Sequence, residues 1–98
     1  MKSIIIHEDA EAELWHAVDF YEDKVPGLGL DFEKSIRIAL SSVQEAPKRW
    51  PKSKNGARRL LLDRFPFAIF YIEYTDFIWV IAFAHTSRKP FYWKKRIF

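Results

Sequence analysis

A histidine stands directly before a segment in which basic and aromatic residues alternate. His85 is followed by Arg88 and Lys89, and then by three consecutive aromatic residues, 91–93. A free imidazole, with a pKa of about 6.5, can donate or accept a proton near neutral pH. Arginines hold phosphates through paired hydrogen bonds, and aromatic rings stack on bases. This pattern favours phosphate chemistry on a nucleic acid.

Cleavage of RNA by its own 2′-hydroxyl needs proton transfer and cations that stabilise the pentacovalent phosphate, and both can be supplied without a metal. His85 suits either proton-transfer role. Arginines at four positions are candidates to hold phosphates: Arg58, Arg59, Arg64 and Arg88. Tyr92 can donate a proton or stack on a base, and both roles stay open.

Ordinary structural roles compete for the same residues. His85 can hydrogen-bond a carbonyl and end the last strand. Alternation along a strand points one of Arg58 and Arg59 toward the helices, where it would pair with an acid such as Glu22. Trp93 is expected to pack over the sheet.

Charge is divided sharply between the two halves of the chain. Residues 1–46 carry ten acidic and four basic residues, a net charge of −6, whereas residues 47–98 carry 12 basic and three acidic ones, a net charge of +9. We therefore expect an acidic face and a basic face, and the basic face favours a polyanionic partner, either nucleic acid or an acidic protein. Further basic residues are candidates for this contact: Lys52, Lys54, Lys89, Lys94, Lys95 and Arg96.

Length and composition exclude several classes of protein. A chain of 98 residues, 49% of them hydrophobic, is expected to form one domain over 1–98 rather than a disordered chain. Cysteine is absent and the three histidines are scattered, so we expect no disulfide, no metal and no cofactor. No apolar run reaches the roughly 20 residues of a membrane span. The N-terminal segment turns acidic at Glu8, so we expect a cytoplasmic protein without a membrane partner.

The N-terminal half predicts one strand and two amphipathic helices. Residues 3–7 are a short β-branched run, typical of a strand. Asp9 is the expected N-cap of a helix over 9–24, and a Pro-Gly pair ends that helix. A second helix starts at residue 28 and ends before Pro47. The short link predicts an antiparallel helical hairpin.

The C-terminal half predicts three strands, over 58–64, 67–74 and 77–85. Their short connections require antiparallel pairing in a meander. The last two strands are apolar almost throughout, so both of their faces need cover. The helices cover one face, and the other needs the C-terminal segment or a partner.

The expected fold class is therefore α+β: an N-terminal strand, a two-helix hairpin, a three-stranded antiparallel meander and a basic, aromatic tail. The tail, residues 86–98, shows no secondary-structure period. Three tryptophans are predicted to lie in or near the core: Trp15, Trp50 and Trp79.

Four features, in this order along the chain, resemble the RelE/ParE superfamily of type II toxin–antitoxin toxins. They are AEL at 12–14 with AVDFYE at 17–22, PGLGLDF at 26–32, RR at 58–59 with RFPF at 64–67, and AHTSRKP at 84–90 with YW at 92–93. Together they span nearly the whole chain. They are most similar to the plasmid-stabilisation, ParE-like branch.

The resemblance implies a growth-inhibiting toxin held inactive by a cognate antitoxin. It leaves the target open, because RelE-like members cut mRNA on the ribosome whereas ParE-like members poison DNA gyrase. A degenerate toxin that only binds its antitoxin is a third alternative. All three imply an acidic or amphipathic antitoxin segment that lies across the basic half and orders on binding.

The resemblance also implies site residues. RelE-like nucleases place basic residues on the second strand and near the end of the last strand, and a tyrosine in the tail. Arg59, His85 or Arg88, and Tyr92 match these positions and are the catalytic candidates. Two further likenesses are weaker: Lys52 and Lys54 match lysines after the second helix, and Glu45 lies near a catalytic glutamate of another branch.

Overall fold

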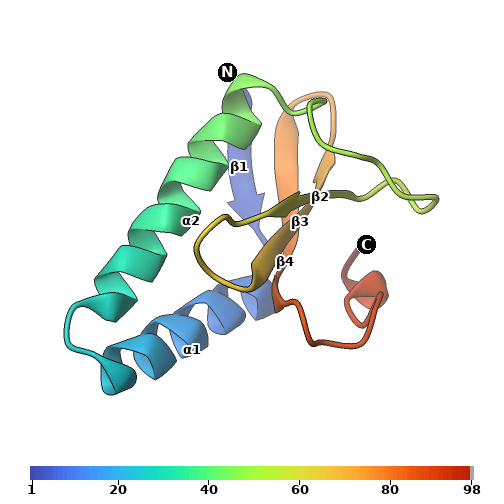
Figure 1. The fold of residues 1–98 in the computed structure, drawn as a ribbon. Coiled ribbons are helices and arrows are strands. Elements are labelled where there is room, and N and C mark those ends of the chain that lie inside the picture. Colours follow the sequence, from blue (N-terminus) through green and yellow to red (C-terminus); the bar gives the residue numbers. More distant parts are fainter. Residues whose placement is uncertain (98) are drawn as a thin grey trace.

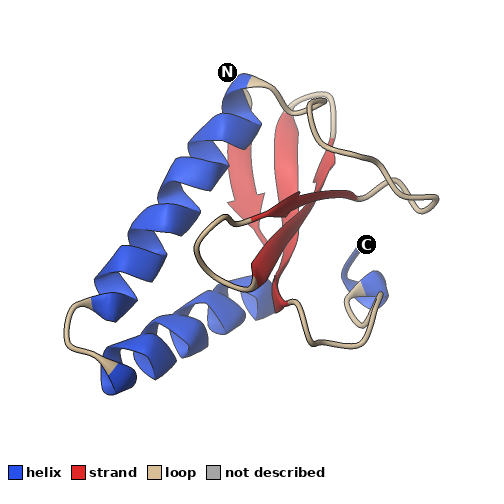
Figure 2. Cartoon of the chain, in the orientation of Figure 1, coloured by secondary structure: helices blue, strands red, loops and turns tan. Residues whose placement is uncertain are grey.

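The computed structural model describes residues 1–97 and contains one mixed sheet, two long helices and a short C-terminal helix (Figures 1 and 2). The elements are β1 (Ser3–Ile6), α1 (Glu8–Lys24), α2 (Leu28–Glu45), β2 (Arg58–Leu61), β3 (Phe67–Glu73), β4 (Phe77–His85) and the 3-10 helix η1 (Lys94–Ile97). The predicted α+β class, helical hairpin and antiparallel meander are confirmed. No helix within residues 1–97 has the length and apolar character that a bilayer span requires.

The sheet order is β1-β4-β3-β2, so the first strand lies beside the last. β1 runs parallel to β4, while β4, β3 and β2 pair antiparallel. β2 is shorter than predicted because the chain leaves the ladder after Leu61, and Phe65 then turns into the core at 6% exposure. The Leu62 N–H still donates a hydrogen bond to the Phe67 carbonyl at 3.0 Å, and residues 63–66 form the bend that joins β2 to β3.

The helical hairpin is closed by a carboxylate cap and a close helix contact. Glu22 accepts hydrogen bonds from the backbone N–H groups of Gly27 (2.8 Å) and Gly29 (3.0 Å). Gly27 has a φ of 89°, which favours glycine. A Cβ on Gly29 would lie 2.6 Å from the carbonyl oxygen of Val18, so only glycine allows the two helices to approach this closely.

Two sequence-based predictions about α1 are wrong. Its N-cap is His7 rather than Asp9, because the His7 Nδ1 accepts a hydrogen bond from the Asp9 N–H at 2.9 Å. Trp15 is 45% exposed, since Leu14 and Ala17 are the residues that α1 turns toward the sheet. The other two tryptophans, Trp50 and Trp79, are partly buried as expected.

Each face of the sheet has its own core. On one face the helices bury Phe32, Ile36 and Val43 against strand residues. On the other, the tail (residues 86–97) folds back and buries Trp93 against Ile81 and Ala82. Figure 1 shows the hairpin and the tail on opposite sides of the strands. The tail is therefore the predicted second cover of the sheet, and it contains a 3-10 turn that the sequence pattern did not predict.

Candidate nucleic-acid interface

A groove of about 420 Å³ lies where the tail meets the sheet. Its basic side chains come from three separate segments: Lys52 from the loop before β2, Arg59 from β2, and His85, Arg88 and Lys89 from the end of β4 and the tail. Among the described residues, none of those that line this groove is an aspartate or a glutamate. We call it the basic groove, and it attracts anions because no carboxylate in its lining offsets the cations.

The alternation of β2 decides which of its two arginines faces the groove. Arg59 pairs with Phe70 in the ladder, on the tail side, and its side chain is exposed. Arg58 points to the opposite side and donates a hydrogen bond to the carbonyl of Trp50 at 2.8 Å. The prediction that the inward arginine pairs with Glu22 is wrong, because the Glu22 carboxylate caps the helical hairpin instead.

His85 is the last residue of β4 and pairs across the ladder with Phe67. The two rings meet edge to face, with their centroids 5.3 Å apart. Its Nδ1 accepts a hydrogen bond from the Ser87 N–H at 3.0 Å, and the Ser87 hydroxyl lies 2.8 Å from the same nitrogen. A backbone N–H can only donate, so the neutral ring carries its proton on Nε2. His85 is therefore a hydrogen-bond donor through Nε2.

Glu13 of α1 holds the tail through several contacts. Its carboxylate accepts hydrogen bonds from the Tyr92 hydroxyl (2.6 Å), from the Arg96 guanidinium (2.9 and 3.1 Å) and from the Phe83 N–H (3.2 Å). The carboxylate is 16% exposed, so these partners replace most of its water. Glu13, an acid of the first half of the chain, thus holds Tyr92 and Arg96, which are both among the last seven residues.

Tyr92 positions Arg88 rather than offering a free hydroxyl. Burial, and next the hydrogen bond to Glu13, raise the pKa of the Tyr92 phenol above its ordinary range. Its ring lies 3.8 Å from the Arg88 guanidinium carbon, a cation–π contact. The Arg88 side chain remains 52% exposed at the rim of the basic groove, 4.0 Å from Glu13.

Replacement of Glu13 by glutamine tests this junction. We expect Glu13→Gln to lower the free energy of unfolding by about 2–3 kcal/mol, because the Arg96 side chain, 16% exposed, then keeps only the more distant carboxylate of Asp9, at 3.9 Å. Urea denaturation measures the loss. Glu11→Gln, an exposed acid on the same helix, is the control and should change stability by less than about 0.5 kcal/mol. Equal losses in the two variants would contradict a special role for Glu13.

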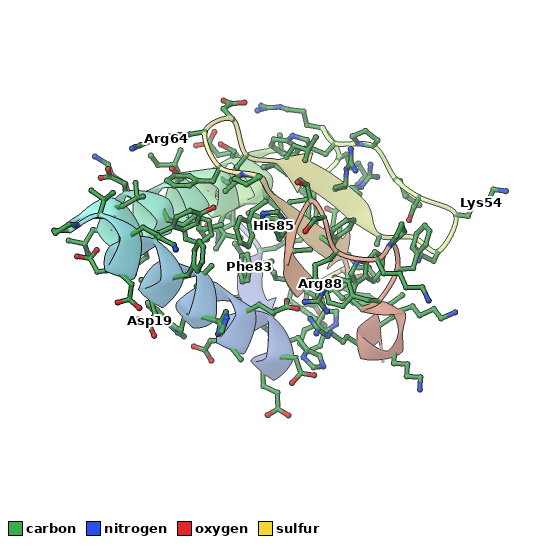
Figure 3. The ribbon with its side chains drawn as sticks, turned by 60° about the horizontal axis from the view of Figure 1, so that its bottom comes forward. Asp19, Lys54, Arg64, Phe83, His85 and Arg88 are labelled. Carbon is green, nitrogen blue, oxygen red and sulfur yellow. The ribbon has the colours of Figure 1, made fainter. Side chains whose placement is uncertain are left out.

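Several predicted binding residues lie outside the basic groove. Arg64 pairs with Asp31 of α2 at 3.3 Å, and Arg96 is turned inward to Glu13. Figure 3 shows Arg64 and Lys54 far apart, on opposite sides of His85. The remaining residues that do not line the groove are Arg58, Lys94 and Lys95, together with Glu45 at the end of α2.

Glu13 is a structurally central residue whose role the sequence pattern did not predict. It lies next to the buried positions Ala10, Leu14 and Ala17 along α1, so it borders the apolar face. A carboxylate at the edge of a buried stripe needs a polar partner. The position of Glu13 at the edge of the apolar face was therefore the signal in the sequence that it needs a polar partner. Its partners lie about 80 positions later in the chain.

A second cavity, of about 500 Å³, lies between α1 and the ends of β3 and β4. Its lining includes Phe20, Phe67 and Phe83, and it shares His85 and Arg88 with the basic groove. Within residues 1–97 no cluster of three His, Asp or Glu side chains could hold a metal ion.

The fold of this chain matches that of a solved structure, although the two sequences differ at most positions. A chain of the structure titled "Chromosomal ParDE TA system from P. aeruginosa" is similar over 87% of this chain and 96% of its own, with a TM-score of 0.76 and 22% sequence identity. This chain has a RelE/ParE-like fold. At 22% identity the likeness shows the fold alone, the arrangement of strand, helical hairpin and meander described above. No family model and no curated protein matches the sequence.

Proposed function

We propose that the protein is the toxin of a type II toxin–antitoxin system and that it binds and cleaves RNA in the basic groove. The observation that carries this proposal is the convergence of five basic side chains on one groove whose described lining holds no carboxylate: Lys52, Arg59, His85, Arg88 and Lys89. A RelE/ParE-like fold supports the proposal, because the similar structure is titled as a toxin–antitoxin system.

The groove residues divide the chemistry by their geometry. Arg59 and Arg88 hold the scissile phosphate and stabilise the charge that grows on it during attack by the 2′-hydroxyl. His85 donates a hydrogen bond from Nε2 to the departing 5′-oxygen and stabilises the negative charge that develops there, while water takes the proton of the attacking 2′-hydroxyl and returns one to the 5′-oxygen. Tyr92 positions Arg88. Lys52 and Lys89 bind neighbouring phosphates.

The same groove explains how an antitoxin neutralises the protein in this proposal. Lys52, Arg59 and Lys89 form no ion pair with a carboxylate among the described residues. An acidic, amphipathic antitoxin segment can therefore supply the missing negative charge and keep RNA out.

A second candidate function is inhibition of DNA gyrase by binding. The helical hairpin exposes four large apolar side chains, none of which lines the basic groove: Trp15 (45%), Phe20 (52%), Leu30 (66%) and Ile38 (59%). Such side chains mark a protein-contact surface when they gather on one side of a molecule.

Induced expression with two readouts tests both candidates. We expect growth arrest with rapid loss of mRNA and codon-phased 5′ ends, and we expect His85→Ala to lose both effects. Intact mRNA with trapped gyrase–DNA complexes would favour the second candidate and sink the first. Normal growth with retained binding to an antitoxin would leave only the degenerate alternative.

A further inference from the structure

Phe91 has a backbone conformation that a bulky residue rarely adopts. Its φ is 61°, and it is the one non-glycine residue of positive φ within residues 1–97. A non-glycine residue in the left-handed region costs about 1–3 kcal/mol and persists where its surroundings fix it. Here the Phe91 carbonyl accepts a hydrogen bond from the Lys94 N–H at 3.1 Å, and Trp93 is anchored two residues later.

This conformation places an aromatic ring at the groove with half of its surface exposed. Phe91 lines the basic groove and is 50% exposed. Its ring meets the edge of Trp93 at 5.7 Å, and Trp93 in turn lies on Phe70 at 4.8 Å. The three rings form a series from the sheet outward, and Phe91 is its open end. Trp93 itself, at 1% exposure, is too buried to bind a base.

We propose that Phe91 forms a subsite for an unstacked nucleobase of single-stranded RNA. The subsite deepens the proposed function and rests on it. A nucleic acid fits better than a peptide side chain because Arg88 and Lys89, within three residues of the ring, also line the groove and can hold the phosphates on either side of the base. The ring already lies against Trp93, so it loses less conformational freedom than an isolated surface ring when a base stacks on it.

The subsite is tested by the affinity of the full chain for a labelled single-stranded oligoribonucleotide of roughly ten nucleotides. We expect Phe91→Leu to weaken binding about ten-fold, the loss of one base–aromatic stack. Tyr74→Leu is the matched control, because Tyr74 is also an exposed aromatic residue (37%) but lines neither the basic groove nor the second cavity. It should leave the affinity unchanged.

A second variant separates loss of the ring from loss of the fold. Phe91→Gly accepts the positive φ without strain, so its thermal midpoint should not fall below that of Phe91→Leu. Its affinity for the oligoribonucleotide should nevertheless be as low. An oligoribonucleotide with abasic positions should bind the unaltered chain and Phe91→Leu equally.

The outcomes distinguish the two proposals. If the unaltered chain binds the oligoribonucleotide and Phe91→Leu binds it equally well, the subsite is wrong and the RNA-binding groove stands. Restored affinity in Phe91→Gly would also overturn the subsite. If the unaltered chain does not bind the oligoribonucleotide, the proposed function fails and the subsite fails with it.

Discussion

Arg59→Ala should lower the rate of RNA cleavage by about 100-fold or more, the usual effect of removing one pre-organised donor from a transition-state oxyanion. Arg59 is the one arginine of β2 that faces the basic groove, and no other groove arginine shares its strand. Its side chain is exposed, so the loss should appear in cleavage and not in folding. Cleavage of a defined RNA on purified ribosomes measures the rate.

Arg37→Ala is the control for the loss of a positive charge. Arg37 is an exposed arginine of α2, paired with Glu33 at 3.8 Å within the same helix. The variant should cleave RNA at the original rate. Equal loss in both variants would show that overall charge, and not the position of Arg59, controls activity. If Arg59→Ala still cleaved RNA at the original rate, the basic groove would not be the site of cleavage.

Trp93→Ala should lower the free energy of unfolding by about 3–5 kcal/mol, the range for removal of a large buried aromatic side chain. Trp93 is 1% exposed and is the largest side chain in the core between the tail and the sheet. Its loss leaves a cavity over Ile81 and Ala82 and releases the tail. Denaturation by urea gives the change in stability.

Trp15→Ala is the matched control, because Trp15 is 45% exposed on α1. It should cost far less than Trp93→Ala. Similar losses in the two variants would mean that the tail is not part of the cooperative core. The RNA affinity of Trp93→Ala should also fall, since the released tail carries Arg88 and Phe91 away from Arg59.

The tail therefore links stability to the candidate function. Trp93 and the Glu13 contacts hold it on the sheet, while Arg88, Lys89 and Phe91 of the same segment line the basic groove. A partner that displaced the tail would dismantle the groove as well as uncover apolar strand residues. Stability and activity should accordingly fall together in variants of Trp93.

The opposite charges of the two halves of the sequence do more than form an acidic face and a basic face, because some of them pair with one another. Arg96, Arg88 and Arg64 of the basic half reach carboxylates of the acidic half, at Glu13 and Asp31. These ion pairs join the tail and the β2–β3 loop to the helices. Three other cations of the basic groove form no ion pair with the described carboxylates of the acidic half: Lys52, Arg59 and Lys89.

The sequence by itself determined the four strands and two long helices of this protein and the class of its fold, although not the 3-10 helix of the tail. Local patterns suffice for this, because Pro26-Gly27 stops a helix wherever it occurs and short links force neighbouring strands to pair antiparallel. Even the need for a second cover on the sheet followed from the apolar strands. The N-cap of α1 and the end of β2 were predicted wrongly. The His7 side chain caps α1 through a hydrogen bond, and Phe65 is buried in the core, and the local sequence pattern shows neither contact.

Only the tertiary structure decided which basic residues form one site. Arg59, His85 and Lys52 line one groove because β3 lies between β2 and β4 and the tail folds back over β3 and β4. Arg64 and Arg96 instead pair with carboxylates elsewhere. Such a choice depends on distances between residues far apart in the chain. The partners of Glu13 illustrate this physical reason: a carboxylate selects the donors that folding brings within about 3 Å, wherever they lie in the sequence.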